Sequence, residues 1–150
     1  PLAISNFLER KPIPVHGAGT HVRSWLYVRD FCRAIDSVLH KGRVGEVYNA
    51  SGFEKTNLET LGAVHATLNL PEPLQTYLAH TGDRPGADTR YAPHAGKIEH
   101  ELGWRPLHSF DDMIHDTVAW YLDNHAWWQK LKSQPAFVDH YKRQMEAKYY

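Results

Sequence analysis

The sequence predicts an α/β protein whose sheet is only partial. Segments with helical apolar periodicity alternate with short runs of β-branched and aromatic residues, which is the pattern of an α/β fold. The candidate strands number only three or four, too few for a self-contained doubly wound sheet. A partial sheet has unpaired edges that another part of a protein has to cover. We therefore expect a portion of a larger fold.

The composition is that of an ordinary globular domain. The 150 residues are enough for one core, with 42% hydrophobic and 23% charged residues. Lys plus Arg equals Asp plus Glu at 17 each, which argues against nucleic acid or an anionic membrane as a partner. No apolar run approaches the roughly 20 residues that a membrane span needs. The single cysteine, Cys32, excludes an internal disulfide and makes a reducing cytoplasm the expected location.

The first elements follow from apolar spacing and from prolines and glycines. Residues 2–8 carry apolar side chains at helical spacing and predict a short helix. The prolines of segment 11–14 end it, and residues 13–16 are expected to be extended. Gly17-Ala18-Gly19 predicts a turn, and the Trp-Leu-Tyr-Val run at 25–28 predicts a strand.

A second helix is expected to begin at Asp30 as its cap and to run to about Leu39. Gly42 ends it, and residues 44–50 predict a further strand. The predicted apolar face of this helix consists of Phe31, Ala34, Ile35, Val38 and Leu39.

The middle of the chain carries a capping box, with Thr56 as the cap and Glu59 three residues later. Residues 76–79 predict a short strand, and residues 83–86 predict a turn because Pro and Gly occupy its second and third positions after Asp83. The helix after the capping box has one apolar side, made by Leu58, Leu61, Val64 and Leu68.

Two helical patterns and a tail complete the chain. Residues 93–102 predict a helix closed by Gly103. Ser109 caps the strongest helix, with Asp111 and Asp112 in the first turn, where the helix dipole favours them. Its predicted buried stripe is Phe110, Met113, Ile114, Thr117, Val118 and Tyr121. The tail after Asn124 predicts one or two more packed helices, through Trp127, Trp128, Leu131, Val138, Tyr141 and Met145.

Arg23 and Arg84 are the first candidates for binding chemistry, because a guanidinium fork matches phosphate oxygens bidentately. Arg84 precedes a proline, which favours an extended backbone there. The pattern alone favours the alternative, a surface arginine paired with Asp83 or Asp88. Asn57, in the first turn of a predicted helix, is a further candidate for a phosphate, with plain capping as the alternative.

The other motifs do not indicate a catalytic, cofactor-binding or metal-binding site. Gly17-Ala18-Gly19 is not a dinucleotide fingerprint, because Val22 stands at the third glycine position and no strand–turn–helix unit surrounds it. The histidines lack metal-ligand spacing. Cys32 is predicted to be a small core residue rather than a nucleophile. No Tyr-x-x-x-Lys pair for proton transfer is present, so we expect no catalytic, cofactor-binding or metal-binding residues in this chain.

Four segments together resemble a known family: PIPVHGAGTHVRSWLYVRDFCRAI, GEVYNASGFEKTNLETL, DRPGADTRYAPHAGKIEHELGW and SFDDMIHDTVAWYLDN. The resemblance is to extended short-chain dehydrogenases that act on sugar nucleotides, and most closely to the dTDP-glucose 4,6-dehydratases. It implies that residues 1–150 are the carboxy-terminal substrate-binding portion of such an enzyme. Residues 25–52 are similar to the last strand–helix elements of its Rossmann domain, most of whose sheet is missing here.

The resemblance also implies a cofactor and partners. NAD, bound mainly by the missing amino-terminal portion, would oxidise the sugar at C4, water would leave across C5 and C6, and hydride would return to C6. The family's cofactor loop and Tyr-x-x-x-Lys pair are absent, so this chain alone is expected to be inactive and to bind no NAD. The expected partners are a dTDP- or UDP-sugar and the amino-terminal Rossmann portion, with a homo-oligomer as a further expectation.

The family's nucleotide contacts fall on six positions of this sequence. By resemblance, Arg23 and Arg84 grip the diphosphate and Asn57 supports it. His16 stands where many dehydratases have a tyrosine beside the nucleobase, and Pro14 and Val15 adjoin it. Two departures, His16 and an alanine after the Asp-Arg-Pro-Gly run, leave the base open. Also open are a UDP-sugar epimerase or decarboxylase, a non-catalytic binding remnant, and an interaction piece.

Overall fold

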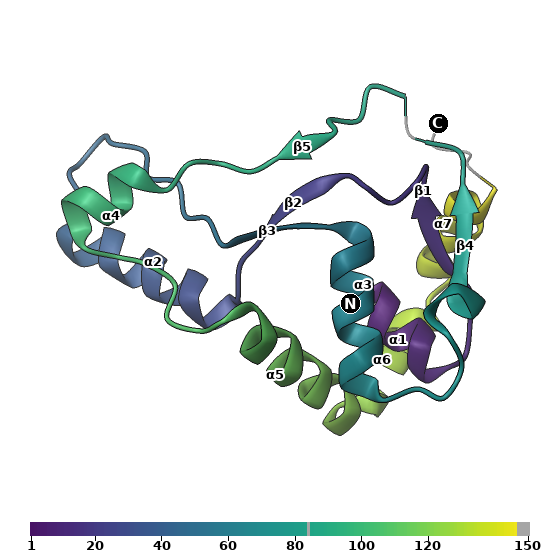
Figure 1. Ribbon diagram of the computed structural model, residues 1–150. Helices are drawn as coiled ribbons and strands as arrows, with labels where there is room; N and C mark the ends of the chain where they lie inside the picture. Colours follow the sequence, from purple (N-terminus) through teal and green to yellow (C-terminus); the bar gives the residue numbers. More distant parts are fainter. Residues whose placement is uncertain (84, 147–150) are drawn as a thin grey trace.

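The computed structural model describes residues 1–83 and 85–146 and shows a small α/β structure with an elongated outline (Figure 1). The helices are α1 (Leu2–Leu8), α2 (Val28–Lys41), α3 (Asn57–Leu68), α4 (Gly96–Leu102), α5 (Phe110–Asp123), α6 (His125–Lys132) and α7 (Pro135–Met145), with a short 3-10 turn, η1 (Leu74–Tyr77). The strands are β1 (Ile13–His16), β2 (Val22–Trp25), β3 (Phe53–Thr56), β4 (Leu78–Thr81) and β5 (Arg90–Tyr91).

The strands form two small sheets. β1 pairs with β4 in parallel, with Ile13 opposite Leu78. In the second sheet, of order β3-β2-β5, Val22 lies opposite Thr56 in an antiparallel pair and opposite Arg90 in a parallel pair. The predicted α/β class with few, short strands is confirmed.

Most of the core lies in one region, which we call the body: α1, β1, α3, η1, β4, α5, α6 and α7. Phe7 is fully buried and meets Tyr77 edge-on, with ring centroids 5.1 Å apart. The amphipathic faces of the three helices α1, α3 and α5 meet here, as their apolar spacing requires. The buried residues of the body are Ile4, Phe7, Ile13, Val15, Tyr27, Leu61, Val64, Tyr77, Met113, Ile114, Val118, Tyr121 and Trp128.

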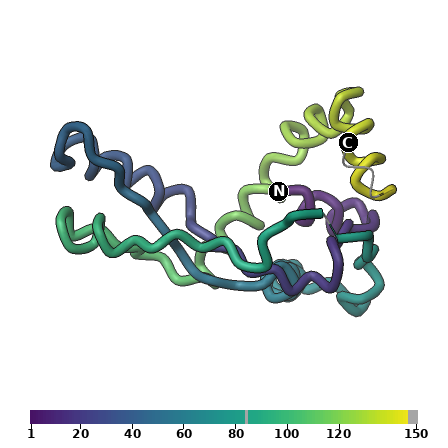
Figure 2. The backbone as a smooth tube through the Cα atoms, turned by 90° about the horizontal axis from the view of Figure 1, so that it is seen from above, coloured from purple at the N-terminus to yellow at the C-terminus, as the bar shows by residue number. Residues whose placement is uncertain are grey.

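A second region, which we call the arm, consists of α2, α4 and the segments between and beside them. It projects away from the body (Figure 2). Its core is small, with Ala34 of α2 packed on Ala95, Ile98 and Trp104. The joint with the body is polar: the buried carboxylate of Asp30 accepts hydrogen bonds from the backbone N–H groups of residues 107 and 108, at 3.1 and 3.2 Å.

Both helix starts with strong capping signals form as predicted. Thr56 and Glu59 make a reciprocal capping box at α3, and Ser109 and Asp112 make another at α5. Gly103 adopts the left-handed conformation, with φ of 65°, and ends α4. The predicted helix at 2–8 and the extended segment 13–16 are confirmed, and the tail forms two helices.

The predicted strand at 25–28 and the cap at Asp30 are wrong. β2 ends at Trp25, and α2 begins at Val28 with Tyr27 as its cap. Residues 26 and 27 do not extend the strand, and Tyr27 instead packs in the buried core of the body. Asp30 lies inside the first turn of α2, where its carboxylate binds the 107–108 backbone rather than the backbone of its own helix.

The predicted strand at 44–50 is also wrong, since this segment has no regular structure and Val44 and Val47 are exposed. A strand needs a partner for its backbone groups, and no described strand lies beside it. The predicted strand at 76–79 forms two residues later, as β4, because η1 takes up residues 76 and 77. The helix predicted from residue 93 begins at Gly96.

Cys32 is exposed, so its prediction as a core residue is wrong. The inward face of α2 is the narrow one of Ala34 and the partly buried Val38. Phe31 and Ile35, predicted to be inside, are 48% and 54% exposed. No helix in the described ranges is long and apolar enough to cross a lipid bilayer.

Candidate functional site

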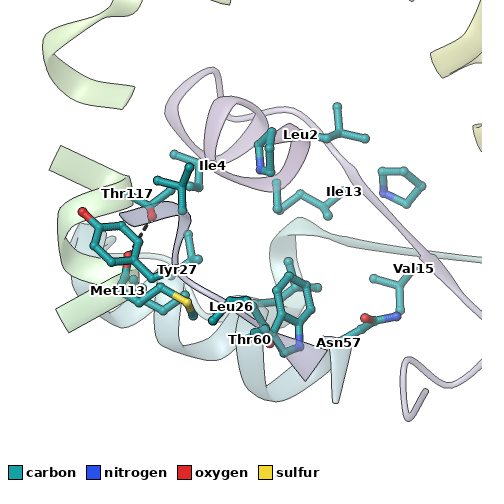
Figure 3. A pocket seen from close by; sticks show the side chains of 18 of the residues that line it. Leu2, Ile4, Ile13, Val15, Leu26, Tyr27, Asn57, Thr60, Met113 and Thr117 are labelled. Atoms are coloured by element: carbon teal, nitrogen blue, oxygen red, sulfur yellow. Dashed lines mark hydrogen bonds between the residues drawn. The ribbon is translucent and has the colours of Figure 1, made fainter. Parts of the chain in front are cut away.

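A cavity of about 500 Å³ opens in the body between α1, β1, α3, α5 and the segment that joins β2 to α2 (Figure 3). Its walls are mainly apolar side chains: Ile4, Ile13, Leu61, Val64, Met113 and Ile114. The size and lining suit a small organic ligand with a flat or apolar part.

Most polar side chains on the wall already have partners inside the protein. The hydroxyl of Tyr27 donates to Asp116 at 3.0 Å, and burial together with this carboxylate raises the pKa of Tyr27, which keeps it protonated. Three other donors are held by backbone oxygens at 2.7 to 3.1 Å: the Thr60 and Thr117 hydroxyls and the Trp25 indole N–H. These groups shape the wall and have no donor left for a ligand.

Asn57 is different. It begins α3 and lies beside Val15 at one end of the cavity, away from Tyr27 and Thr117 (Figure 3). Its carboxamide makes no hydrogen bond to any residue in the described part of the chain. A carboxamide offers two donors and an acceptor, so Asn57 is the side chain on this wall best placed to bind a polar ligand group.

The backbone at the start of α3 is already occupied. The N–H groups of Asn57 and Leu58 donate to the carbonyls of His21 and Gly19 at 3.2 and 3.1 Å, and that of Glu59 donates to Thr56 Oγ1. These amides are therefore not available to a phosphate, and only the Asn57 carboxamide remains for that role.

The turn at residues 17–19 closes tightly on α3. Gly19 has φ of 72°, and a Cβ placed there would come within 2.8 Å of side-chain atoms of Leu58 and Val15. Only glycine meets both demands. The turn therefore fixes the relative position of β1 and α3, whose residues Val15 and Asn57 share the cavity wall.

His16 lines the cavity from the end of β1, next to Pro14 and Val15. Its Nδ1 lies 3.1 Å from Thr81 Oγ1, across the β1–β4 pair in which His16 and Thr81 are in register. The sheet thus fixes the imidazole ring at the cavity edge, where a tyrosine would present a larger ring.

Arg23 lies on β2 beside the cavity but is not one of its lining residues. It is two residues from Trp25, so both side chains lie on the same face of the strand. One guanidinium nitrogen donates to the carbonyl of Val22 at 2.7 Å, and no described carboxylate pairs with the group. Five other arginines do have a carboxylate partner: Arg10, Arg33, Arg43, Arg90 and Arg143.

Comparisons with known proteins identify the family of the chain. Residues 1–117 match the GDP-mannose 4,6 dehydratase family. The chain belongs to this family.

The relatives of this dehydratase family that resemble the chain are much longer than it is. The dTDP-glucose 4,6-dehydratase of Xanthomonas campestris pv. campestris is 46% identical over 136 residues, which is 86% of this chain and 39% of that protein. The chain thus spans about two fifths of the length of the curated relatives it matches.

Solved structures give the same family. The dTDP-glucose 4,6-dehydratase of Bacillus anthracis in complex with NAD is 44% identical, with a TM-score of 0.79, over 88% of this chain and 41% of that one. DesIV, a dTDP-glucose 4,6-dehydratase of Streptomyces venezuelae with NAD and TYD bound, is 41% identical, with a TM-score of 0.80, over 88% and 40%. The extended short-chain dehydrogenase fold is therefore shown.

The six positions inferred from the family are only partly brought together by the described residues. Pro14, Val15, His16 and Asn57 line one cavity, and Arg23 lies next to it. Arg84 is outside the described residues, so its convergence with Arg23 on one diphosphate stays a prediction. On either side of it, Asp83 lies 3.4 Å from His21 Nε2, and Gly86 has φ of 71°, as a turn requires.

Most of the cavity wall in this dehydratase-family chain consists of residues that the sequence did not indicate. Leu2, Ile4, Thr60, Met113 and Thr117 line it from three helices. The apolar stripe of α5 was predicted, but spacing alone does not separate stripe residues that fill a core from those that border a cavity. In the described residues there is no group of three or more His, Cys, Asp or Glu side chains that could hold a metal ion.

Proposed function

We propose that this chain is the sugar-nucleotide-binding part of an NAD-dependent dTDP-glucose 4,6-dehydratase-like lyase, which forms a 4-keto-6-deoxy sugar nucleotide. One observation carries the proposal: an apolar cavity has an uncommitted carboxamide, Asn57, at one end, with Arg23, an arginine that has no described carboxylate partner, close by. Relatives at 41–46% identity that are named dTDP-glucose 4,6-dehydratases support it.

In this proposal the two ends of the ligand use different parts of the site. The nucleobase packs against Pro14, Val15 and His16, and the diphosphate binds Asn57 with Arg23 and Arg84. Guanidinium forks bind phosphate oxygens with two parallel hydrogen bonds. The chain contributes position rather than chemistry: it holds the sugar where catalytic groups of the whole enzyme act on it.

The glycine-rich turn at 17–19 does not fit the pyrophosphate of NAD. It connects two strands, and its inner side is filled by Leu58 and Val15. We therefore place NAD on the amino-terminal portion of the whole enzyme, and we assign no catalytic residue to this chain.

The proposed partner of the chain is that amino-terminal Rossmann portion. α2 has a second apolar face that points away from its small core: Val28, Phe31, Ile35 and Leu39 are 63%, 48%, 54% and 76% exposed. A helix that is apolar on two faces is typical of a helix between two layers. We propose that this face packs on the Rossmann portion and that residues 44–50 join the edge of its sheet.

Calorimetry of the chain with dTDP tests the binding role. We expect weak, salt-sensitive binding that falls by at least about tenfold in Arg23→Ala and in Arg84→Ala, since a charge-assisted hydrogen bond contributes about 1.5–3 kcal/mol. Arg105→Ala is the matched control, because Arg105 is exposed and lies away from the cavity. Binding that is insensitive to salt and to Arg23→Ala would contradict the proposal.

The reaction is tested on the whole enzyme. Conversion of dTDP-glucose to its 4-keto-6-deoxy product supports the dehydratase, whereas interconversion of UDP-sugars or loss of carbon dioxide identifies the epimerase or decarboxylase alternative. A protein that binds dTDP without turnover of any of these substrates is the non-catalytic alternative.

A further inference from the structure

α1 and β1 form one wall of the cavity, and the last two helices, α6 and α7, bind the side of this wall that faces away from the cavity. Leu2, Ala3 and Ile4 of α1 and Ile13 and Pro14 of β1 face the cavity. On their other side lie α6 and α7, which follow the part of the chain matched by the family (Figure 1). Trp128 anchors α6 to α5, because its buried indole N–H donates to the carbonyl of Tyr121 at 2.8 Å.

Lys132, at the end of α6, is bound to α1 at three points. Its ammonium group donates to Ser5 Oγ at 3.1 Å, to Asn6 Oδ1 at 2.7 Å and to Glu9 Oε2 at 2.6 Å. Its side chain is only 13% exposed. All three N–H bonds of the ammonium group are engaged, so its position relative to α1 is fixed.

Tyr141, on α7, holds the segment that leads into β1. Its hydroxyl donates to the carbonyl of Pro12 at 2.7 Å and accepts from Asn6 Nδ2 at 3.2 Å, and the same Asn6 nitrogen donates to Pro12 at 2.6 Å. Asn6 is 1% exposed. One buried carboxamide thus connects α6, α7, α1 and the start of β1.

The turn between α1 and β1 is held by local backbone hydrogen bonds, in which the N–H groups of Arg10 and Lys11 donate to the carbonyls of Phe7 and Asn6 at 3.1 and 2.8 Å. Arg10 adopts φ of 53° there, in the left-handed region that non-glycine residues seldom occupy. The wall in front of it is apolar and includes Ile4 and Ile13, which are 4% and 3% exposed. β1 is also held by its pairing with β4, and α1 by its contacts with α3 and α5, so the last two helices add a further support to this wall.

We propose that Lys132 and Tyr141 are positioning residues: through Asn6 they hold α1 and the segment that leads into β1 in place, so that the cavity stays wide enough for a nucleobase. Neither residue lines the cavity. The affinity for a nucleotide therefore depends on a helical tail that does not touch it. The inference rests on the proposed nucleotide-binding function of the same cavity.

The test combines two variants, a control and two measurements on the chain. Lys132→Met keeps the side-chain length without the donors, and Tyr141→Phe removes a single oxygen. Lys130→Met is the control, since Lys130 is exposed on the same helix and its side chain makes no hydrogen bond in the described residues. Amide hydrogen exchange is followed without ligand, and dTDP affinity is measured well below the unfolding temperature.

We expect Lys132→Met to weaken dTDP binding about tenfold and Tyr141→Phe about threefold, with Lys130→Met unchanged, because a hydrogen bond to a charged group contributes more than a neutral one. Exchange should speed up over residues 2–16 and stay constant over residues 57–68. Lys132→Arg, which retains N–H donors, should recover part of the affinity. This recovery would not follow from a general loss of packing.

The outcomes separate this inference from the proposed function. If the unaltered chain has no affinity for dTDP, the proposed function fails, and faster exchange confined to residues 2–16 still tests the hold on the wall. If the unaltered chain binds dTDP but Lys132→Met and Tyr141→Phe bind it equally well, the tail is only structural and the inference is overturned. If Lys132→Met does not fold, Tyr141→Phe decides alone.

Discussion

The body and the arm are built from the same kinds of helix but bury very different amounts of apolar surface. The body encloses thirteen buried hydrophobic residues in one cluster. The arm encloses four, and α2 leaves larger apolar side chains outside than the Ala34 it buries. The body therefore has a core of its own, whereas the arm carries an apolar pattern that its own contacts do not use.

The joint between the body and the arm is made by polar groups rather than by a large apolar contact. Asp30 is 1% exposed and accepts bonds from two backbone N–H groups, from His108 Nδ1 at 3.0 Å and from Arg33 at 2.9 Å. The carbonyl of Asp30 also accepts the indole N–H of Trp104 at 3.2 Å. One carboxylate thus connects the arm to the segment that enters α5, and the arm's orientation depends on it more than on its small core.

The largest effect on stability is expected in the body. Phe7→Ala removes a fully buried ring that contacts Tyr77 and His65, with centroid distances of 5.1 and 5.8 Å. Such a substitution costs about 3–5 kcal/mol through lost burial and the cavity it leaves. Urea denaturation measures the change in the free energy of unfolding. A loss below about 1 kcal/mol would mean that the body does not depend on this cluster.

The joint comes next. Asp30→Ala leaves two backbone N–H groups without their acceptor and should cost about 3 kcal/mol. Burial alone would raise the pKa of Asp30, but the bonds from His108, from the 107–108 backbone and from Arg33 outweigh it and lower the pKa. The stability it contributes is thus fully present above about pH 4, the unfolded value, and is lost as the pH falls toward the lower folded value.

The pH dependence is checked by urea titrations between pH 2 and 6 on both proteins. The stability difference between the unaltered chain and Asp30→Ala should shrink as the pH falls below 4. A difference that stays constant across this range would show that ionised Asp30 contributes nothing to the joint.

The body and the arm also differ in how well their elements could be predicted from the sequence. In the body, the helices 2–8 and 110–123, the capping box at Thr56 and the strand at 13–16 depend on local spacing and on packing within the chain, so they formed as expected. In the arm, the strand at 44–50 did not form and the predicted face with Phe31 is exposed, so neither pattern is satisfied by contacts within the described chain. A local apolar or β-forming pattern indicates that a segment packs against another one, but it does not indicate which segment that is.

The candidate site shows a different limit. Residue type and resemblance indicated Pro14, Val15, His16 and Asn57, which line one cavity, and their role in binding a ligand stays a prediction. Neither indicated that the first amides of α3 are occupied by the carbonyls of residues 19 and 21, because that depends on how the turn at Gly19 closes. Tertiary hydrogen bonds of this kind are set by the approach of distant segments, for which the sequence offers no spacing rule.

A smaller effect is expected at the two capping boxes, one beside the cavity and one at the base of the arm. Thr56→Ala and Ser109→Ala each remove a hydroxyl that accepts the N–H of the third helical residue at 3.1 Å. Each should cost about 1 kcal/mol of unfolding free energy. Only Thr56→Ala should also weaken dTDP binding, since Asn57 follows it directly. If both variants bind dTDP with equal affinity, then the capping hydroxyl of Thr56 does not contribute to the binding site.

The smallest effect on stability is expected on the outer face of α2, where the comparison between body and arm is sharpest. Ile35→Gln replaces a side chain that is 54% exposed and should change the free energy of unfolding of the chain by no more than about 0.5 kcal/mol. The same substitution should weaken association with a separately produced amino-terminal Rossmann portion, measured by sedimentation. Asp36→Asn, on an exposed position of the same helix, is the control and should leave association unchanged. If Ile35→Gln destabilises the chain as much as Phe7→Ala does, then Ile35 belongs to a stable core within the arm. The proposal that the outer face of α2 packs on the Rossmann portion would then be contradicted.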